Sequence, residues 1–556
     1  MKILANKYLL ITSLCGASFV SGAFLNETAV LDKITPAMVK GAQELMGLNF
    51  TDAQIDSTLN ELTDLRQGYE TIRKINLTND IPPAITFNPI PVGFQFKKER
   101  QPFKLPKAEP VSLPVNRDEL AFYTIPQLAE LIRTKKISSE ELTRFFLDRL
   151  KKYDPQLHCV TSLTEELALQ QARRADQEIK AGKYKGLLHG IPYGAKDLLS
   201  TRTYKTTWGS VPYKDQVIDK DATVIQKLAA AGAILVAKTT LGELAMGDVW
   251  YGGKTRSPWN TQNGSSGSSA GSASAVAAGL LPFAIGTETL GSIVSPSTAC
   301  GTTGLRPTYG RVSRNGAMAL SWSMDKIGPI ARATEDCAIV FNAIYGPDGL
   351  DQSVINAPFN YDPKLNVKSL RVGYVKADFD RNYPTKANDQ ATLEVLRKAG
   401  VELIPIELPK LPAGELTMTI SVEGAAAFDE LTRSGRDKLM VNQGKNAWPN
   451  IFRTARFVPA VEYLQAQRVR YLLVQEMAKV MQNIDVYVAP SFSSTLSITN
   501  LTGHPCVVVP NGFNQRNMPT TITFIGQLFG EGKALALAKA YQNATEFHKK
   551  HPALPL

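Results

Sequence analysis

Two kinds of hydrophobic pattern alternate along the chain from about residue 118 onward. Apolar residues three and four positions apart predict amphipathic helices, and short continuous apolar runs predict buried strands. We expect helices over residues 125–134, 138–152, 164–180 and 221–231, and strands over residues 233–237, 370–375, 401–406, 486–489 and 506–509. Short buried strands separated by helices are typical of an α/β fold with a mixed β-sheet covered on both faces by helices.

The region ahead of this alternation has a different pattern. Residues 36–75 carry helical spacing in two halves, divided by the turn-like residues 49–52. Residues 81–114 contain eight prolines, which favour extended backbone over helix or sheet. We therefore expect an N-terminal helical and Pro-rich extension over residues 23–117 and a main domain over residues 118–550.

The first 22 residues resemble a secretory signal peptide. Lys2 and Lys7 precede a mostly apolar run over residues 8–20, and small residues follow at positions 21–23. The apolar run is shorter than the roughly 20 residues that a membrane-spanning helix needs. We expect a secreted or periplasmic protein with no membrane span in the mature chain. A retained anchor is the alternative.

Composition and charge exclude several classes of protein. The chain has 556 residues, of which 44% are hydrophobic and 20% charged, as in globular proteins and unlike disordered or collagen-like chains. The formal net charge is +11, but the densest basic stretches, residues 97–100 and 133–136, are short. Nucleic-acid binding needs clustered charge, so we expect no nucleic-acid partner.

The Ser- and Gly-rich segment over residues 264–274 has the composition of a flexible linker. Core-like sequence follows it directly over residues 275–285, which favours a folded loop whose N–H groups and hydroxyls converge on a small polar group. Ser269 also fits a G-x-S-x-G nucleophile elbow of the esterase type. That motif requires a strand immediately before it, and residues 257–264 have the composition of a loop.

Histidine and cysteine are too sparse to indicate a metal site. The histidines are His158, His189, His504, His548 and His551, and the cysteines beyond Cys15 are Cys159, Cys300, Cys337 and Cys506. No spacing among them is typical of metal ligands or of a disulfide scaffold, so we expect buried free thiols. A Ser-His-Asp triad would have to recruit one of the first three histidines.

Lysine is the known substitute for histidine as the base of a serine enzyme. Lys196 lies in the largely uncharged segment Gly190–Asp197. It is a candidate base, and the alternative is a simple ion pair with Asp197. Acting as a base at neutral pH requires a pKa about 3 units below its free value, which costs roughly 4 kcal/mol.

Three segments together resemble the core motifs of the amidase signature hydrolases. They are Gly-Ile-Pro-Tyr-Gly-Ala-Lys-Asp at 190–197, Ser-Ser-Ala-Gly-Ser at 268–272 and Gly-Thr-Glu-Thr-Leu-Gly-Ser-Ile at 286–293. They occur in the family's order, with 72 residues from Lys196 to Ser268 and 24 from Ser268 to Ser292. Residues 300–308 and 503–510 also follow the family pattern, so the resemblance covers about residues 118–550.

The resemblance implies the roles of individual residues. Lys196 would be the base, Ser268 a bridging serine held by a cis peptide, and Ser292 the nucleophile. The oxyanion hole would consist of the N–H groups of Thr289, Leu290, Gly291 and Ser292, with Ser269 and Gly271 supporting the loop. The activity implied is hydrolysis of small-molecule or peptide carboxamides to carboxylate and ammonia or amine through an acyl-enzyme, with no metal or organic cofactor.

Some features depart from the family pattern or leave other functions open. Leu290 replaces a common glycine, while Glu288 and Val294 replace a frequent Asp and Arg, a variant that resembles a peptide-amidase-like branch. Within the family, the alternative is the A-type subunit of a tRNA-dependent amidotransferase, which the signal-peptide pattern disfavours. Outside it, the alternatives are a decayed binding protein and the Ser269 esterase. We expect the pocket walls to come from residues 344–472.

Overall fold

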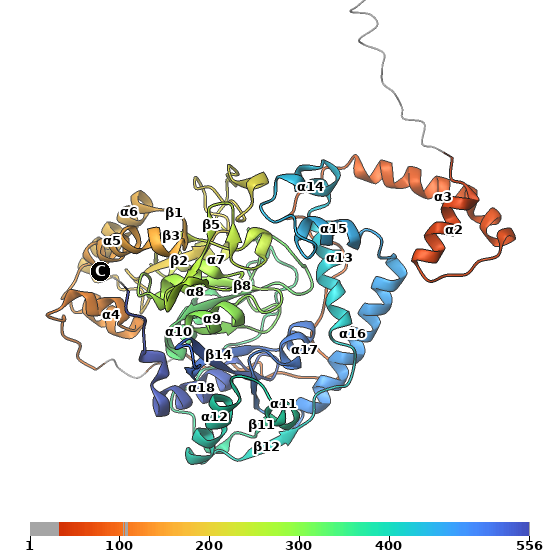
Figure 1. The fold of residues 1–556 in the computed structure, drawn as a ribbon. Helices are drawn as coiled ribbons and strands as arrows, with labels where there is room; N and C mark the ends of the chain where they lie inside the picture. Colours follow the sequence, from red (N-terminus) through yellow and green to blue (C-terminus); the bar gives the residue numbers. More distant parts are fainter. Residues whose placement is uncertain (1–32, 104, 106–108, 555–556) are drawn as a thin grey trace, which may run out of the picture. The chain divides into compact units, whose positions relative to one another are not determined.

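The chain divides into two compact units, Met1–Leu77 and Thr78–Leu556. The computed structural model, drawn in Figure 1, describes residues 33–103, 105 and 109–554. The predicted signal peptide lies outside the described residues. The boundary between the compact units falls earlier in the chain than residue 117, and the domain limits expected from the sequence stay a prediction.

The described part of the first unit is a pair of helices, α2 (Pro36–Leu45) and α3 (Asp52–Arg73). Thr51 and Gln54 form a capping box at the start of α3. The N–H of Thr51 donates to Gln54 Oε1 (2.8 Å), and the N–H of Gln54 donates to Thr51 Oγ1 (3.4 Å). The two-part helical pattern predicted over residues 36–75 is therefore confirmed.

The second unit is built on a mixed sheet of eleven strands in the described chain, in the order β1-β3-β2-β8-β10-β9-β14-β15-β13-β11-β12. The strands are β1 (Val160–Leu163), β2 (Pro192–Lys196), β3 (Ile234–Thr239), β8 (Phe283–Glu288), β9 (Thr303–Arg306), β10 (Lys326–Ala331), β11 (Val372–Val375), β12 (Leu403–Ile406), β13 (Val486–Pro490), β14 (Cys506–Phe513) and β15 (Pro519–Gly526). β2 pairs in parallel with β3 and β8, and β11 with β12 and β13, whereas the other pairs are antiparallel.

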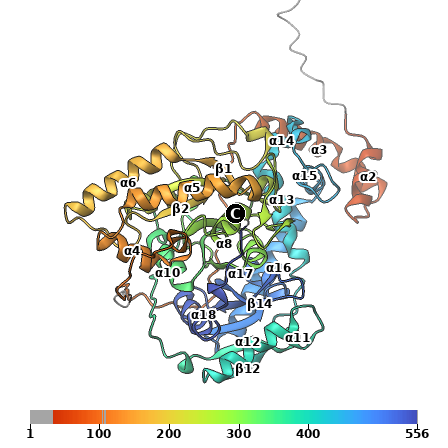
Figure 2. The same ribbon diagram turned by 60° about the vertical axis from the view of Figure 1, so that its left-hand side comes forward.

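Helices flank this sheet (Figures 1 and 2). They are α4 (Ile125–Arg133), α5 (Ser139–Leu157), α6 (Glu165–Lys180), α7 (Thr223–Ala230), α8 (Ala270–Ala277), α9 (Val294–Cys300), α10 (Thr334–Ile344), α11 (Lys376–Asp380), α12 (Lys386–Lys398), α13 (Met418–Ala427), α14 (Asp429–Arg433), α15 (Trp448–Ala455), α16 (Ala460–Met481), α17 (Ser494–Thr502) and α18 (Glu531–Thr545). Figure 2 shows α5 and α6 beside each other near β1.

Alternate residues of the central strands enter different hydrophobic clusters, as expected when both faces of a sheet are covered. In β3, Leu235 packs in one cluster, whereas Ile234 and Val236 pack in another with residues of α5, α6 and α8. In β14, Val507 belongs to the first cluster and Val508 to a third that includes residues of α16 and α17. The predicted fold class, a mixed sheet covered on both faces by helices, is confirmed.

The predicted elements of the second unit are found within a few residues of their expected limits. The helix expected over residues 138–152 extends to Leu157 as α5, and Ser138 caps it together with Glu141. The described residues of the Pro-rich stretch 81–114 contain no helix or strand, as predicted. Elsewhere in the described chain, Cys159, Cys300, Cys337 and Cys506 are buried and free. No helix in the described ranges is both long and apolar enough to span a bilayer.

Candidate active site

The Ser- and Gly-rich segment is a buried loop, so the linker interpretation is wrong. The loop connects β7 (Asn260–Gly264) to α8 and contains a cis peptide bond between Gly267 and Ser268. Ser268 is 1% exposed. A Cβ atom on Gly267 would lie 1.8 Å from the carbonyl oxygen of Gly247, so this close approach admits only glycine.

Lys196 ends strand β2 and is fully buried. Its Nζ donates to Ser268 Oγ (2.8 Å), Thr287 Oγ1 (2.9 Å) and Ser269 Oγ (3.1 Å). Asp197 does not pair with it. The carboxylate of Asp197 instead forms a buried ion pair with Lys238 (Nζ–Oδ1 2.9 Å), which removes the simple ion-pair explanation for Lys196.

The environment of Lys196 favours a neutral amine. Burial lowers the pKa of Lys196 to about 7, although the charges of Asp325 and Glu288 act in the opposite direction. An amine with this pKa is partly unprotonated at neutral pH, when its nitrogen lone pair is able to accept a proton from a neighbouring hydroxyl.

The hydroxyl of Ser269 is engaged by the backbone, which is typical of a structural residue and not of a nucleophile. Its hydroxyl donates to the carbonyl oxygen of Thr287 and accepts the N–H of Thr287, both at 3.1 Å, and its side chain is fully buried. Strand β7 ends at Gly264 and pairs only with β6 (Arg256–Ser257) in a separate two-stranded sheet. The strand-to-helix turn of a nucleophile elbow is therefore absent at Ser269.

Gly271 packs the start of α8 against the neighbouring backbone. A Cβ atom there would lie 2.2 Å from the carbonyl oxygen of Cys159 and 2.5 Å from the N–H nitrogen of Thr240. The N–H of Gly271 donates to the carbonyl oxygen of Thr240 (3.0 Å). Gly271 therefore supports the loop, as the resemblance implies.

Ser292 lies in the turn between β8 and α9, beside the Ser268 loop. The N–H of Ser269 donates to the carbonyl oxygen of Ser292 (3.2 Å) and joins the two segments. Within the described ranges, no hydrogen bond directly links Ser268 Oγ to Ser292 Oγ. The structure thus brings Lys196 and Ser268 into contact and places Ser292 in the adjoining turn.

The turn that carries Ser292 has the features of an oxyanion hole. The N–H groups of Thr289, Leu290, Gly291 and Ser292 donate to no protein acceptor among the residues that the structure describes. Gly291 has a φ of +79°, a conformation that favours glycine. N–H groups without a protein acceptor are free to donate to a developing oxyanion.

The carboxylate of Glu288 holds this turn through hydrogen bonds to the backbone that follows it. Its Oε2 accepts the N–H groups of Ile293 (2.8 Å) and Val294 (3.0 Å), and its Oε1 accepts from the buried Arg306 (2.8 Å). Burial opposes ionisation of Glu288, but Arg306 and Lys326 outweigh it and lower the pKa of this carboxyl to about 2. Glu288 therefore remains charged and holds the start of α9 in place.

A second carboxylate supports the turn and was not anticipated from the sequence. Asp325 accepts Thr289 Oγ1 (2.6 Å) and the N–H of Leu320 (2.8 Å), and Lys326 Nζ donates to the carbonyl oxygen of Thr289 (3.3 Å). Burial raises the pKa of Asp325 and lowers that of Lys326. No motif surrounds these residues, and only their closeness in space connects them with the site.

The imidazoles of His189 and His504 have partners other than Lys196, Ser268 and Ser292 among the described residues. His189 bonds to Glu178 (3.1 Å), and His504 bonds to Thr502 (2.8 Å). Burial lowers the pKa of His504 to about 3. Among the described residues, no three His, Cys, Asp or Glu side chains are grouped to hold a metal ion.

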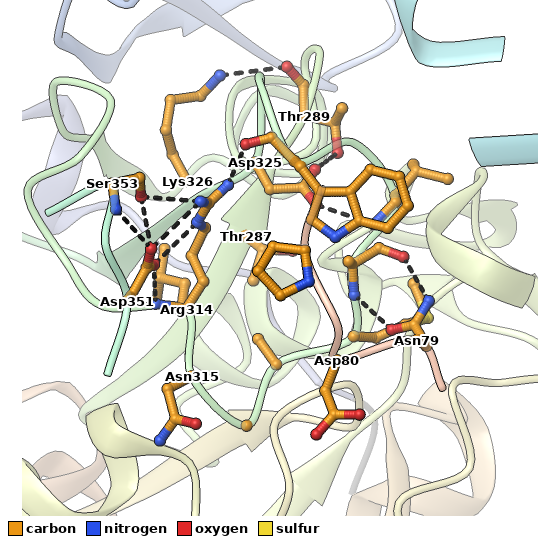
Figure 3. Close-up of a pocket in the computed structure, with 18 of the residues that line it drawn as sticks. Asn79, Asp80, Thr287, Thr289, Arg314, Asn315, Asp325, Lys326, Asp351 and Ser353 are labelled. Carbon is orange, nitrogen blue, oxygen red and sulfur yellow. Dashed lines mark hydrogen bonds and ion pairs between the residues drawn. The ribbon is translucent and has the colours of Figure 1, made fainter. Parts of the chain in front are cut away.

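A cavity of about 530 Å³ borders the cluster at Thr287 and Thr289 (Figure 3). This volume is in the usual range for a site that binds a small ligand. Most of its lining comes from residues 79–86 and 309–327, and Leu198, Ala245, Thr287, Thr289 and residues 350–353 supply the rest. Of the range 344–472, from which we expect the pocket walls, only residues 350–353 line this cavity, and that expectation stays a prediction.

Comparisons with known proteins agree with this geometry. The model of the Amidase family matches residues 141–498. The chain is 35% identical over 483 residues to the A-type subunit of the glutamyl-tRNA(Gln) amidotransferase of Acinetobacter baumannii, covering 78% of this chain and 98% of that protein. The peptide amidase of Stenotrophomonas maltophilia has a similar structure, with 27% identity, a TM-score of 0.69, and coverage of 79% of this chain and 99% of that one. The structure of an amidase family protein from Bacillus anthracis is also similar, with 27% identity and a TM-score of 0.71. The match covers 79% of this chain and 93% of that one.

The chain belongs to the amidase signature family, and the resemblance found in the sequence is confirmed. Members of this family are hydrolases that act on the C–N bonds of amides. The family match covers the motifs around Lys196, Ser268 and Ser292.

Proposed function

We propose that this chain is an amidase that cleaves carboxamides to a carboxylate and ammonia or an amine, with Lys196, Ser268 and Ser292 as its catalytic residues. The observation that carries the proposal is the contact of 2.8 Å between Lys196 Nζ and Ser268 Oγ in a buried setting. The low pKa of Lys196, near 7, supports the role of a base.

In the first half of the reaction, Ser292 Oγ attacks the amide carbon. Its proton passes to Ser268, and the proton of Ser268 passes to neutral Lys196. The N–H groups of residues 289–292 hold the oxyanion that forms, and removing one such donor typically costs about 3–4 kcal/mol of transition-state stabilisation. The C–N bond then breaks as Ser268 gives a proton to the leaving nitrogen, and protonated Lys196 returns its proton to Ser268.

The second half hydrolyses the ester on Ser292. Water loses a proton to Ser268, and Lys196 again takes the proton of that serine. The hydroxide attacks the acyl carbon, the bond to Ser292 Oγ breaks, and the serine is reprotonated. The product leaves as a carboxylic acid that ionises in water.

The test is release of ammonia from a panel of primary carboxamides by the purified chain. We expect turnover by the native protein and none by Ser292→Ala, with both proteins giving the same circular dichroism spectrum. Absence of turnover by the folded native protein would instead favour the decayed binding protein.

The relative from Acinetobacter baumannii motivates a second candidate function, that of the A-type chain of an amidotransferase. The observation in its favour is that the chain spans 98% of that relative at 35% identity. An amidotransferase chain of this kind would need partner chains for its full reaction. Hydrolysis of simple amides by the isolated chain at rates typical of enzymes, about 1 s⁻¹ or more, would favour the amidase.

We also propose that the protein is exported. The support is the order of Lys2 and Lys7, the apolar run over residues 8–20 and the small residues after it. N-terminal sequencing of the mature protein should begin near Ala23 or Phe24. Mature material that still begins at Met1 would contradict export by this route.

A further inference from the structure

The cavity beside the proposed active site has a wall that lies outside the family match. The family match begins at residue 141, and more than a fifth of the chain lies outside the alignment with the amidotransferase relative. Yet residues of the Pro-rich stretch line the cavity that reaches Thr287 and Thr289: Asp80, Pro82, Pro83, Ala84, Ile85 and Thr86. We call residues 80–86 the bridge segment.

Asn79 anchors the bridge segment at one end. Its Nδ2 donates to the carbonyl oxygens of Ala319 (2.9 Å) and Ala427 (3.3 Å), and its Oδ1 accepts the N–H of Ala319 (2.8 Å). Figure 3 shows Asn79 held in this way at the edge of the cavity. Next to it, Asp80 forms an ion pair with Lys220 (2.8 Å).

Phe87 anchors the other end. Its ring meets the ring of Tyr309 edge to face, with centroids 5.1 Å apart, and the guanidinium of Arg470 lies 3.7 Å from the ring centroid. Pro82 and Pro83 stiffen the span between the two anchors because each proline ring fixes its own φ. The bridge segment is therefore a fixed part of the cavity wall.

The bridge segment contributes mainly apolar side chains to the cavity. Pro82, Pro83 and Ile85 face a cavity that Met318, Trp322 and Leu350 also line. The charged groups of the lining already have partners within the protein. Arg314 pairs with Asp351 (3.1 Å) and donates to Ser353 Oγ (2.8 Å), as Figure 3 shows.

We infer that the bridge segment is a specificity-determining contact for an extended apolar group of the amide substrate. This inference rests on the proposed function. Thr287, Thr289 and the bridge segment line one cavity of about 530 Å³, which a small amide would not fill. A longer apolar group would contact the bridge segment and displace water from it. The preferred substrates are then amides that carry a long aliphatic or aromatic group, either on the acyl carbon or on the nitrogen.

The experiment compares two exposed aliphatic residues of the Pro-rich stretch. Ile85 is 75% exposed and lines the cavity, while Val92 is 79% exposed and does not. The full-length protein carries Ile85→Ala, Val92→Ala or the double change Pro82→Gly/Pro83→Gly. For each variant, kcat/KM is measured on two series of amides from two to ten carbons, one lengthened on the acyl side and one on the nitrogen side.

The measured quantity is the ratio of kcat/KM for the longest amide to that for the shortest. We expect this ratio to fall about fivefold in Ile85→Ala in at least one series, as loss of part of an apolar contact predicts, and at least as far in the double variant. Val92→Ala should keep the native ratio. An unchanged ratio in Ile85→Ala and in the double variant, or an equal fall in Val92→Ala, would overturn the inference.

A second readout separates this inference from the proposed function. Alkyl fluorophosphonates with short and long chains should label Ser292, and Ile85→Ala should slow labelling by the long reagent relative to the short one. If Ser292→Ala still hydrolysed amides, the proposed function would fail. If labelling and turnover both needed Ser292 but chain length had no effect in any variant, only the role of the bridge segment would fail.

Discussion

Lys196 differs from the equally buried Lys238 in the hydrogen-bond partners of its amino group. Lys238 is equally buried but pairs with Asp197, whereas Lys196 has only hydroxyl and carbonyl oxygens within hydrogen-bond distance. Without a carboxylate in contact, burial dominates and the charged form loses stability. The position of one aspartate, turned toward another lysine, thus leaves Lys196 available as a base.

This pKa predicts the pH dependence of the reaction. Below pH 7, Lys196 becomes protonated and cannot accept a proton, so kcat/KM should fall about tenfold for each further pH unit. Above pH 7 the amine is neutral and kcat/KM should level off. Steady-state kinetics on an uncharged amide from pH 5 to 10 measures this, and a rise that continues to pH 10 would contradict a lowered pKa.

The contact between Lys196 and Ser268 predicts non-additive losses. Lys196→Ala and Ser268→Ala should each lower kcat/KM by several orders of magnitude, and the double variant should be scarcely worse than either, because each change breaks the same proton relay. Ser272→Ala is the matched control, since Ser272 Oγ donates to the carbonyl oxygen of Ile285 (3.1 Å) and has no contact with Lys196. Additive losses in the double variant would argue against a shared relay.

At the scale of elements, the turn between β8 and α9 depends on a buried ion pair. Glu288→Gln keeps the shape of the side chain but leaves Arg306 without its counter-charge, and breaking a buried pair typically costs about 3–5 kcal/mol. We expect a lower melting temperature and a lower kcat. Glu531→Gln is the control, because it breaks the buried Glu531–Arg311 pair (3.2 Å) away from this turn and should lower stability with less effect on kcat.

The same carboxylate gives a pH dependence of stability. The folded pKa of Glu288 lies below its unfolded value, so its contribution of about 3 kcal/mol is present above pH 4.5 and is lost as the pH falls toward 2. The melting temperature of the native protein should therefore fall more steeply than that of Glu288→Gln between pH 5 and pH 3. Parallel curves would show that Glu288 has the same pKa in the folded and unfolded states.

Periodicity predicted the strands that carry continuous apolar runs but missed β1, β9, β10 and β15, and also β2 and β8 at the site. Both central strands are short and contain glycine, and β2 ends in Lys196 while β8 ends in Glu288. At Gly194 a Cβ atom would lie 2.6 Å from Leu281 Cδ1, so tight packing rather than hydrophobicity determines the residue there. The family motifs at 190–197 and 286–293 nevertheless include the last residues of β2 and β8, because these strands position Lys196 and the turn that carries Ser292.

Part of the candidate site could not be predicted from the sequence at all. Asp325 lies in a segment without a motif and accepts a hydrogen bond from Thr289 Oγ1 in the turn between β8 and α9. Arg306 lies within the recognised segment 300–308, but its ion pair with Glu288 is not indicated by that pattern. The structure places no helix or strand in the bridge segment, as its prolines predicted, but nothing in those prolines indicated that it lines a cavity. Such contacts depend on tertiary packing, which a local pattern does not encode.

At the scale of the whole molecule, the division between the compact units predicts where the chain tolerates truncation. A chain that begins at Thr78 keeps Asn79 and Phe87, so its melting temperature and activity should stay close to those of the native protein. A chain that begins at Asn88 loses both anchors and should melt several degrees lower. Calorimetry and amide hydrolysis measure both. Equal melting temperatures of the two truncated chains would show that the anchors add no stability.

Alkylation of the four buried cysteines would report local unfolding of the segments that surround them. Burial raises the pKa of each of these thiols, that of Cys506 to about 12, so almost none is present as the reactive thiolate in the native fold. Iodoacetamide therefore reaches these sulfur atoms only after the surrounding strands or helices separate. Because Cys159, Cys300, Cys337 and Cys506 lie in different parts of the large sheet and its helices, the order in which they are alkylated would map which regions open first.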